Sequence, residues 1–170
     1  MSLALRRLTA DDAAVLRELR LEAFAVHPRD FRSSPADEAA APLAALAGKL
    51  GRDHVLGLFD GETLVGAAGL SIDPRAKLAH KGLIWGVYVR PAWRGQGGAE
   101  RLLAGLIEAA KGRVESLHLV VSDGNGPALR LYTRLGFSQW ALEPRALRLD
   151  DGTWVDEIWM ERSPVHPPHK

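Results

Sequence analysis

A basic, glycine-rich turn lies near the middle of the chain, between a strand-like apolar run and a helix-like one. The turn consists of Arg94, Gly95, Gln96, Gly97, Gly98 and Ala99. The first amides of a helix have no acceptor within that helix, and glycines let a backbone approach a bound anion closely. We therefore expect the turn and the start of the helix to bind a phosphate-type group.

Two common nucleotide-binding loops fit this turn poorly. A dinucleotide loop needs G-x-G-x-x-G directly after the first strand of a βαβ unit, and here Glu100 stands at the position of the last glycine. A P-loop needs Gly-Lys followed by Ser or Thr, which the turn lacks. Both alternatives are disfavoured.

A second motif follows about thirty residues later. It comprises Asn125, Ala128, Tyr132 and the run Leu135-Gly136-Phe137. In the turn itself, Arg94, Gly97 and Ala99 match the pattern Arg/Gln-x-x-Gly-x-Gly/Ala. Together the two motifs resemble those of the GCN5-related N-acetyltransferases, whose turn binds the pyrophosphate of coenzyme A. Gly98 departs from the aliphatic residue common there, which lowers helix propensity.

The resemblance covers nearly all of residues 3–162 and implies a fold and an activity. The fold class is α/β, with a mixed, mostly antiparallel central sheet and helices on both faces. The implied activity is N-acetyltransfer from acetyl-CoA to a primary amine by direct attack, in a single domain over residues 1–162. We expect residues 163–170, which contain three prolines, to be a disordered tail.

The resemblance also assigns the cofactor contacts. The pantetheine arm would pair as an added strand with main-chain groups of Val87 and Val89, and one of these amides would stabilise the developing oxyanion. Asn125 would hydrogen-bond the cofactor, although asparagine is also an ordinary turn residue.

Candidates for proton transfer follow from the same comparison. Tyr132 is the candidate general acid, because a phenol can protonate a thiolate leaving group; its alternative role is to pack a short helix on the sheet. The candidate general bases are Glu22, His80 and Glu157, each of which can equally be a solvated or structural residue.

The acceptor pocket implied by the fold lies at the loop between the first two helices. Its candidate residues are Phe24, Phe31, Ser33, Ser34 and Trp85. Simple packing is an alternative for Trp85, because aromatic side chains dominate burial.

The order of elements agrees with this fold. Alternation and turn signals predict strands, and three- and four-residue spacing predicts helices. The expected strands are 3–8, 54–59, 62–72, 78–89, 114–121, 137–149 and 153–162. The expected helices run from Thr9 to about Val26, from Ser34 to near Gly51, from Gly97 to Lys111 and from Pro127 to Leu135.

Composition limits the other function classes. The 170 residues carry a formal charge of +1 and contain no cysteine, so we expect no nucleic-acid partner, no thiolate nucleophile and no Cys-type zinc site. Histidines lack carboxylate partners at metal-ligand spacing, so no metal is expected. Without an apolar run of about 20 residues we expect no membrane insertion and a cytoplasmic location.

Two other functions remain open. One is a noncatalytic acyl-CoA sensor on the same fold, and the other is a protein-interaction module that works through its last hairpin. Edge pairing could also support a homodimer. The acceptor is a small-molecule or peptide amine that the sequence does not identify.

Overall fold

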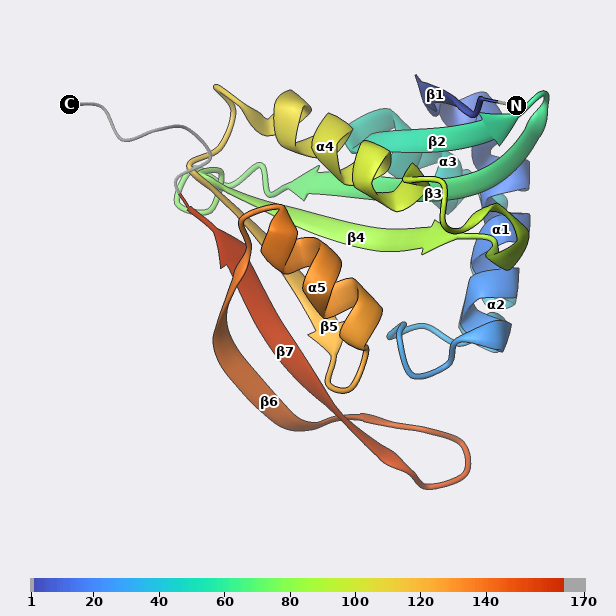
Figure 1. The fold of residues 1–170 in the computed structure, drawn as a ribbon. Helices are drawn as coiled ribbons and strands as arrows, with labels where there is room; N and C mark the ends of the chain where they lie inside the picture. The colour runs from blue at the N-terminus through green and yellow to red at the C-terminus, as the bar shows by residue number, and fades with distance from the viewer. Residues whose placement is uncertain (1, 164–170) are drawn as a thin grey trace.

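Seven strands hydrogen-bond into one sheet in the computed structural model, which describes residues 2–163. The strands are β1 (Ala4–Arg7), β2 (His54–Asp60), β3 (Thr63–Ile72), β4 (Lys81–Val89), β5 (Ser116–Ser122), β6 (Ser138–Arg148) and β7 (Trp154–Arg162). Their order in the sheet is β1-β2-β3-β4-β5-β7-β6 (Figure 1). Only the β4–β5 pair is parallel among these neighbours.

Helices cover both faces of the sheet. They are α1 (Ala13–Val26), α2 (Pro35–Ala40), α3 (Leu43–Arg52), α4 (Gly98–Ala110) and α5 (Gly126–Arg134), with 3-10 turns η1 (Ala10–Asp12) and η2 (Pro91–Trp93). One apolar core joins the sheet to α4 and α5, and a second joins it to α1 and α3. The expected fold class, a mostly antiparallel mixed sheet between helices, is confirmed.

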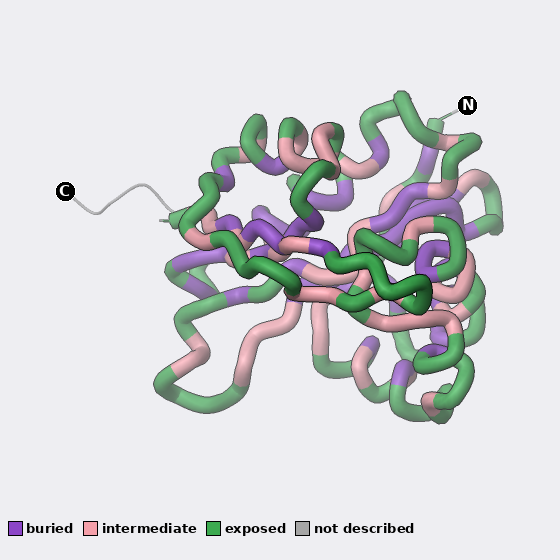
Figure 2. Tube along the Cα trace, turned by 90° about the horizontal axis from the view of Figure 1, so that it is seen from below, coloured by how far each residue is buried: buried purple, intermediate pink, exposed green. Residues whose placement is uncertain are grey.

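The two cores form because each helix turns one apolar stripe toward the sheet. Leu102, Leu103 and Leu106 of α4 are completely buried, and Leu16 and Leu19 of α1 are nearly so. Figure 2 shows the buried segments concentrated along the sheet and the inner sides of the helices.

The prediction of one continuous helix from Ser34 to near Gly51 is wrong, because the structure has two helices there, α2 and α3. Ser34 caps α2, with its Oγ accepting the amide of Asp37 at 3.1 Å. Pro42 lacks an N–H and forces the preceding residue out of helical geometry, and Ala41 is extended, with φ −72° and ψ 137°.

The strand expected from Leu78 begins later, at Lys81. The residues before it form hydrogen-bonded turns, in which Leu78 N donates to Arg75 O at 2.9 Å and Lys81 N donates to Leu78 O at 3.1 Å. Local turn hydrogen bonds therefore replace the start of the ladder.

Strands β4 and β5 separate soon after they meet. Their pairing covers only Lys81–Leu83 of β4 with Ser116–His118 of β5. Farther along, Gly86 has a left-handed φ of +64° beside a register shift between β3 and β4, and such a bulge bends and twists a strand. Figure 1 shows the two strands diverging, with α5 lying along β5.

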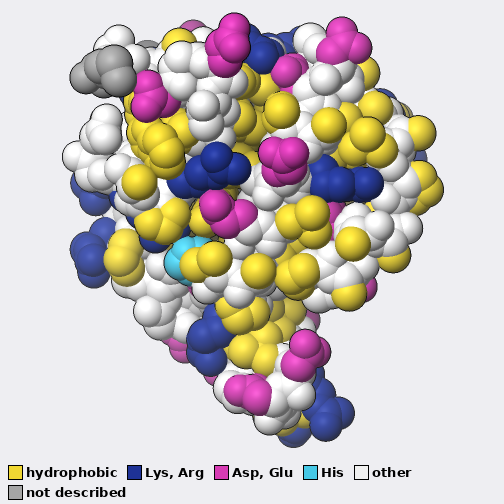
Figure 3. Space-filling model, turned by 90° about the vertical axis from the view of Figure 1, so that its right-hand side faces the viewer, with side chains coloured by type: hydrophobic (Ala, Val, Ile, Leu, Met, Phe, Trp, Pro, Cys, Tyr) yellow, Lys and Arg dark blue, Asp and Glu magenta, His cyan; other side chains and the backbone are white. Residues whose placement is uncertain are grey.

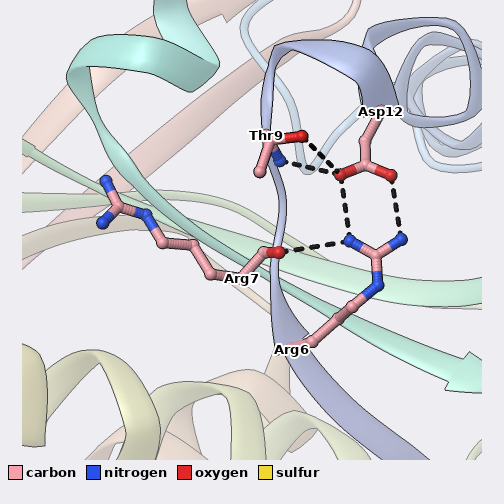
Figure 4. A network of polar contacts seen from close by, with 4 residues as sticks. All are labelled: Arg6, Arg7, Thr9 and Asp12. Atoms are coloured by element: carbon pink, nitrogen blue, oxygen red, sulfur yellow. Dashed lines mark hydrogen bonds and ion pairs between the residues drawn. The ribbon is translucent and has the colours of Figure 1, made fainter.

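An ion pair joins β1 to the start of the first helical segment. Arg6 donates two hydrogen bonds to the carboxylate of Asp12, at 3.0 and 2.9 Å, and the Thr9 amide donates to the same carboxylate at 2.7 Å (Figure 4). The Arg6 hydrogen bonds are the largest cause of the lowered pKa of Asp12. The contact sets the direction in which the chain enters η1.

The β6–β7 hairpin projects from the rest of the molecule. Its register shifts between Glu143 and Leu147, where Arg145 has a left-handed φ of +53°. Figure 3 shows a narrow projection at this end of the molecule, with charged side chains of both signs at its tip.

The disordered tail expected at residues 163–170 lies, apart from Ser163, outside the described residues.

Packing of α4 predicts a large loss of stability on truncation of its inner face. Leu106 is completely buried, so Leu106→Ala should lower the free energy of unfolding by about 2–5 kcal/mol. Leu43→Ala is the matched control, since Leu43 is 42% exposed, and should change it by less than about 0.5 kcal/mol. Urea denaturation measures both, and equal losses would contradict the assigned core.

Candidate active site

The glycine-rich turn forms a tight, left-handed entry into α4. Gly95 and Gly97 have φ of +79° and +74°, a conformation that L side chains adopt only at a cost. The first intrahelical bond runs from Arg101 N to Gly97 O at 3.0 Å, so the amides of the first turn have no acceptor within the helix. The start of α4 therefore has the geometry and partial positive charge that bind anions.

Gly98 serves close packing rather than flexibility. A Cβ at Gly98 would lie 2.6 Å from Cδ2 of Leu58 on β2. With any other residue at this position the buried Leu58 side chain would have to shift, which gives a packing reason for the departure from an aliphatic residue seen in the sequence.

A cavity of about 420 Å³, here called the gap cavity, lies where β4 and β5 have separated. Six of the ten residues predicted to bind cofactor line it, namely Val87, Val89, Arg94, Ala99, Asn125 and Tyr132. The other four, Gly95, Gln96, Gly97 and Gly98, belong to the adjoining turn and helix start. The strand gap, the turn and α5 thus meet at one place.

Main-chain groups of β4 face the gap cavity. Arg90 N donates to Val65 O on the β3 side at 2.8 Å, and successive residues of a strand direct their main-chain groups to opposite edges. Val89 therefore faces β5, and Val87 lines the same cavity two residues earlier, beside the bulge. Arg94 Nε donates to Val89 O at 2.8 Å, so this carbonyl is reached from within the cavity.

A polar network crosses the gap cavity from the α1–α2 loop to α5. Asn125 caps α5 by accepting the amide of Ala128 at 3.3 Å, and its Nδ2 donates to Asp30 Oδ1 at 3.2 Å. Ser122 Oγ also donates to Asp30 Oδ1. His27 Nδ1 lies 3.7 Å from Asp30 Oδ2.

Sequence reasoning missed Asp30, Ser122 and the place of His27 in this network. Ser122 lies 92 positions from Asp30 in sequence, and the three residues match no spacing motif. The signal that could have found them is a polar residue in the loop expected to border the acceptor pocket.

Tyr132 turns its ring into the apolar core beside the gap cavity. The residue is 7% exposed, and its ring meets Phe137 edge-on at a centroid distance of 6.1 Å. Burial, with a smaller contribution from the charge of Asp30, raises the pKa of Tyr132 well above its usual range. The phenol is therefore held in its protonated form, with no hydrogen bond to its hydroxyl from residues 2–163.

The three residues predicted as bases lie in different places. Glu157 is 5% exposed, and its Oε1 accepts Arg32 Nη2 and Nε at 2.7 and 3.0 Å. Glu22 accepts Tyr88 Oη at 3.0 Å and pairs with Arg90 at 3.3 Å. His80 lies just before β4, at the end where β4 and β5 are paired. Glu22 and His80 are outside the gap cavity.

A second cavity, of about 340 Å³ and here called the loop cavity, lies beneath the α1–α2 loop. Of the residues predicted for the acceptor pocket, Phe24, Phe31, Ser33 and Trp85 line it. Ser34 does not, because its side chain caps α2. Glu157 and Arg32 also line the loop cavity.

The gap cavity and the loop cavity meet at a narrow set of side chains. Three described residues line both, namely Asp30, Phe31 and Val120. These three residues therefore lie beside both cavities, and we call them the neck.

Residues 2–163 contain no group of three or more His, Cys, Asp or Glu side chains placed to hold a metal ion. None of the helices in this part of the chain is both long and apolar enough to cross a membrane.

The tyrosines predict an unusual alkaline titration. The chain has two tyrosines; burial and the hydrogen bond to Glu22 raise the pKa of Tyr88 to about 12, and that of Tyr132 is raised further by burial. A tyrosine in the unfolded chain has a pKa of about 10. The raised pKa values of the folded state therefore add to the free energy of unfolding below pH 10, and this contribution is lost as the pH rises toward 12.

Phenolate absorbance checks this expectation. At about pH 10.5, between the unfolded and folded pKa values, the folded protein should show little phenolate. The tyrosines of the urea-unfolded protein should be largely ionised at the same pH. A midpoint near the ordinary value in the folded protein would contradict the buried placement of both rings.

Known proteins with similar sequences are acetyltransferases. The model of the Acetyltransferase (GNAT) family matches residues 14–137. The chain is 36% identical over 115 residues to the N-alpha-acetyltransferase RimI of Mycobacterium tuberculosis, which covers 68% of this chain and 69% of that protein. It is 43% identical over 60 residues to the mycothiol acetyltransferase of Actinosynnema mirum. This matched segment is 35% of this chain and only 20% of that longer protein.

Solved structures share the whole fold. The chain superposes on yncA from Salmonella typhimurium, solved with its cofactor acetyl-CoA, with a TM-score of 0.82 and 22% identity, over 100% of this chain and 98% of the other. The family predicted from the two motifs is confirmed, and with it the prediction of an acetyltransferase. The extent of the family match and the identity to RimI show that the chain belongs to the GNAT family of acetyltransferases.

Proposed function

We propose that the protein transfers an acetyl group from acetyl-CoA to a primary amine by direct attack, with the two substrates entering from opposite sides of the neck. The observation that carries this proposal is the convergence on the gap cavity of the α4 start, the Val87 and Val89 main chain, and Tyr132. Bound acetyl-CoA supplies an acetyl group activated as a thioester.

The residues around the gap cavity fit coenzyme A chemically. Amides of the first turn of α4 suit a pyrophosphate, and the main-chain groups of Val87 and Val89 suit an amide-bearing arm that lies beside β4 as an added strand. Arg94 is within reach of both regions, because it follows η2 and contacts Val89 O. An amide of Val87 or Val89 would stabilise the oxyanion.

Tyr132 acts as the general acid in this proposal. Its protonated phenol lies in the wall of the gap cavity, across from β4, and has a proton to donate to the departing sulfur. Asn125 holds the start of α5, the helix that carries Tyr132, through its cap on Ala128. The same side chain remains our candidate for a cofactor hydrogen bond.

The loop cavity receives the amine in this proposal. Phe24, Phe31 and Trp85 provide apolar walls, while Ser33 and the Arg32–Glu157 pair provide polar contacts. RimI is named an N-alpha-acetyltransferase and another relative a mycothiol acetyltransferase, so both protein and small-molecule acceptors are represented among similar proteins. We keep both classes for this chain.

We also propose that residues 1–162 form one acetyltransferase domain. The single sheet and its two cores support this proposal. The cytoplasmic location and the homodimer stay predictions from the sequence.

Removal of the Tyr132 hydroxyl should slow chemistry without weakening cofactor binding. We expect Tyr132→Phe to lower kcat by about 10² to 10⁴, the usual contribution of a general acid, with the Kd for acetyl-CoA within about twofold, which is a change in binding free energy of less than about 0.4 kcal/mol. Thiol release with a panel of amino acids, polyamines and peptides measures kcat, and calorimetry measures Kd. Unchanged turnover would remove Tyr132 from the mechanism.

The same measurements separate enzyme from sensor. Wild-type protein that binds acetyl-CoA but releases no thiol with any amine would indicate a noncatalytic sensor. Absence of binding at millimolar acetyl-CoA would overturn both functions.

Substitution in the turn should have the opposite effect. Gly97→Val places a branched side chain at a left-handed φ of +74° and should weaken acetyl-CoA binding by distorting the start of α4. Gly97→Asn is the matched control, because asparagine tolerates left-handed geometry, and should retain more affinity. Equal affinity of Gly97→Val and wild type in calorimetry would contradict the role of the turn.

A further inference from the structure

We propose that Asp30, in the loop between α1 and α2, is the general base that takes the proton from the acceptor ammonium. This inference rests on the proposed function and assigns the proton acceptor that the sequence candidates left open. Asp30 matches no sequence motif, and only its position in the folded chain points to it.

Position at the neck is the first argument. In the proposed function the amine occupies the loop cavity and the thioester the gap cavity, so the residues that line both lie beside the place where the two substrates meet. Of Asp30, Phe31 and Val120, only Asp30 can accept a proton.

The hydrogen bonds of Asp30 leave one oxygen available. Ser122 Oγ and Asn125 Nδ2 both donate to Oδ1, which fixes the carboxylate in one orientation. Oδ2 lies 3.7 Å from His27 Nδ1, beyond hydrogen-bond distance. An ammonium in the neck can therefore donate to Oδ2 without breaking the contacts that hold the side chain.

His27 supports this arrangement through its tautomer. Arg94 Nη2 lies 3.0 Å from His27 Nε2, and a guanidinium only donates. Nε2 must therefore accept, which leaves the proton of a neutral ring on Nδ1, facing Asp30.

Glu157 is less suited to the same task. Its Oε1 accepts two hydrogen bonds from Arg32, and the residue lines the loop cavity but not the gap cavity. Arg32 also lies 3.5 Å from Glu143. The Arg32–Glu157 pair is placed to orient the acceptor before it reaches the neck.

Charged and titratable groups around Asp30 come from several elements. His27 ends α1, Tyr132 lies on α5, and Glu157 lies on β7 opposite Ser122. Arg20, Arg32 and Lys49 share the loop cavity with Asp30, and Arg20 is paired with Glu38 at 3.0 Å.

The proton balance is complete without another reactant. The ammonium loses one proton to Asp30 Oδ2, and the neutral nitrogen bonds to the carbonyl carbon. As the C–S bond breaks, its electron pair leaves with sulfur, which takes the Tyr132 proton. The tyrosinate recovers a proton from the new amide nitrogen, and Asp30 releases its proton to solvent, so one proton is released per turnover.

Asp30→Asn and Glu157→Gln form a matched pair of variants, because each exchanges a carboxylate for its amide. Thiol release is measured against pH with ethylamine, a strongly basic amine, and with hydrazine, a weakly basic one. Asp30→Asn should lower kcat/KM for ethylamine by about 10² to 10⁴ and show a smaller defect with hydrazine, and its remaining rate should rise with pH as the free-amine form of each substrate increases. Glu157→Gln should not lose more with ethylamine than with hydrazine.

Two readouts without turnover test whether the variant is intact. Calorimetry should give an acetyl-CoA Kd within about twofold of wild type. In a Tyr88→Phe background, carbon-13 NMR of labelled tyrosine should show Tyr132 ionising at lower pH in Asp30→Asn, because the charge that opposes its ionisation is gone. An unmoved titration would show that Asp30 does not face the phenol.

The outcomes separate this assignment from the function on which it rests. If wild type turns over and Asp30→Asn loses equally with both amines, or loses nothing, Asp30 is not the base. If Glu157→Gln alone loses more with ethylamine than with hydrazine, Glu157 is the base. If wild type turns over no amine, the proposed function fails and the assignment fails with it.

Discussion

The early separation of β4 and β5 is the constraint on which the rest of the structure depends. Pairing between these parallel strands ends after three positions, although β4 continues to Val89 and β5 to Ser122. Strand edges that part inside a sheet expose main-chain donors and acceptors that need partners. The gap is therefore a slot that offers main-chain hydrogen-bonding groups as well as a break in the sheet.

Other elements keep this slot open and shaped. Gly86 bends β4 through its left-handed conformation, and α5 packs along β5 through Tyr132 and neighbouring apolar residues. Gly98 lets α4 approach β2 closely, which brings the helix start to the end of the slot. The packing that closes the core on one face therefore also positions the amides at the start of α4.

The α1–α2 loop completes the site from the other side. It supplies Asp30 and Phe31 to the neck and Arg32 to the loop cavity. Its hydrogen bonds to Ser122 and Asn125 tie the loop to β5 and the start of α5. The loop thus spans the gap without filling it, and the α1–α2 connection is a structural part of the site.

Much of this arrangement is predictable from local sequence. The glycine turn, the apolar spacing of α4, and the Asn125–Tyr132 helix are short-range patterns, because capping, left-handed glycines and helical periodicity act over a few residues. Pro42 also indicates the break between α2 and α3, although the alanine-rich run around it favours one continuous helix. The sequence does not predict the late start of β4, because local turn hydrogen bonds compete there with the hydrogen bonds of the sheet.

The sequence by itself determined the family and the fold class. Val87, Val89, Asn125 and Tyr132, which it predicted as cofactor contacts, line the gap cavity, and it put Glu22 and His80 forward as bases without a means of locating them. Only the tertiary structure decided that those two lie outside the gap cavity and that Asp30 lies at the neck. The reason is physical: the neck joins a loop, β5 and α5, whose contacts span about ninety residues of chain, and periodicity carries no information over that separation.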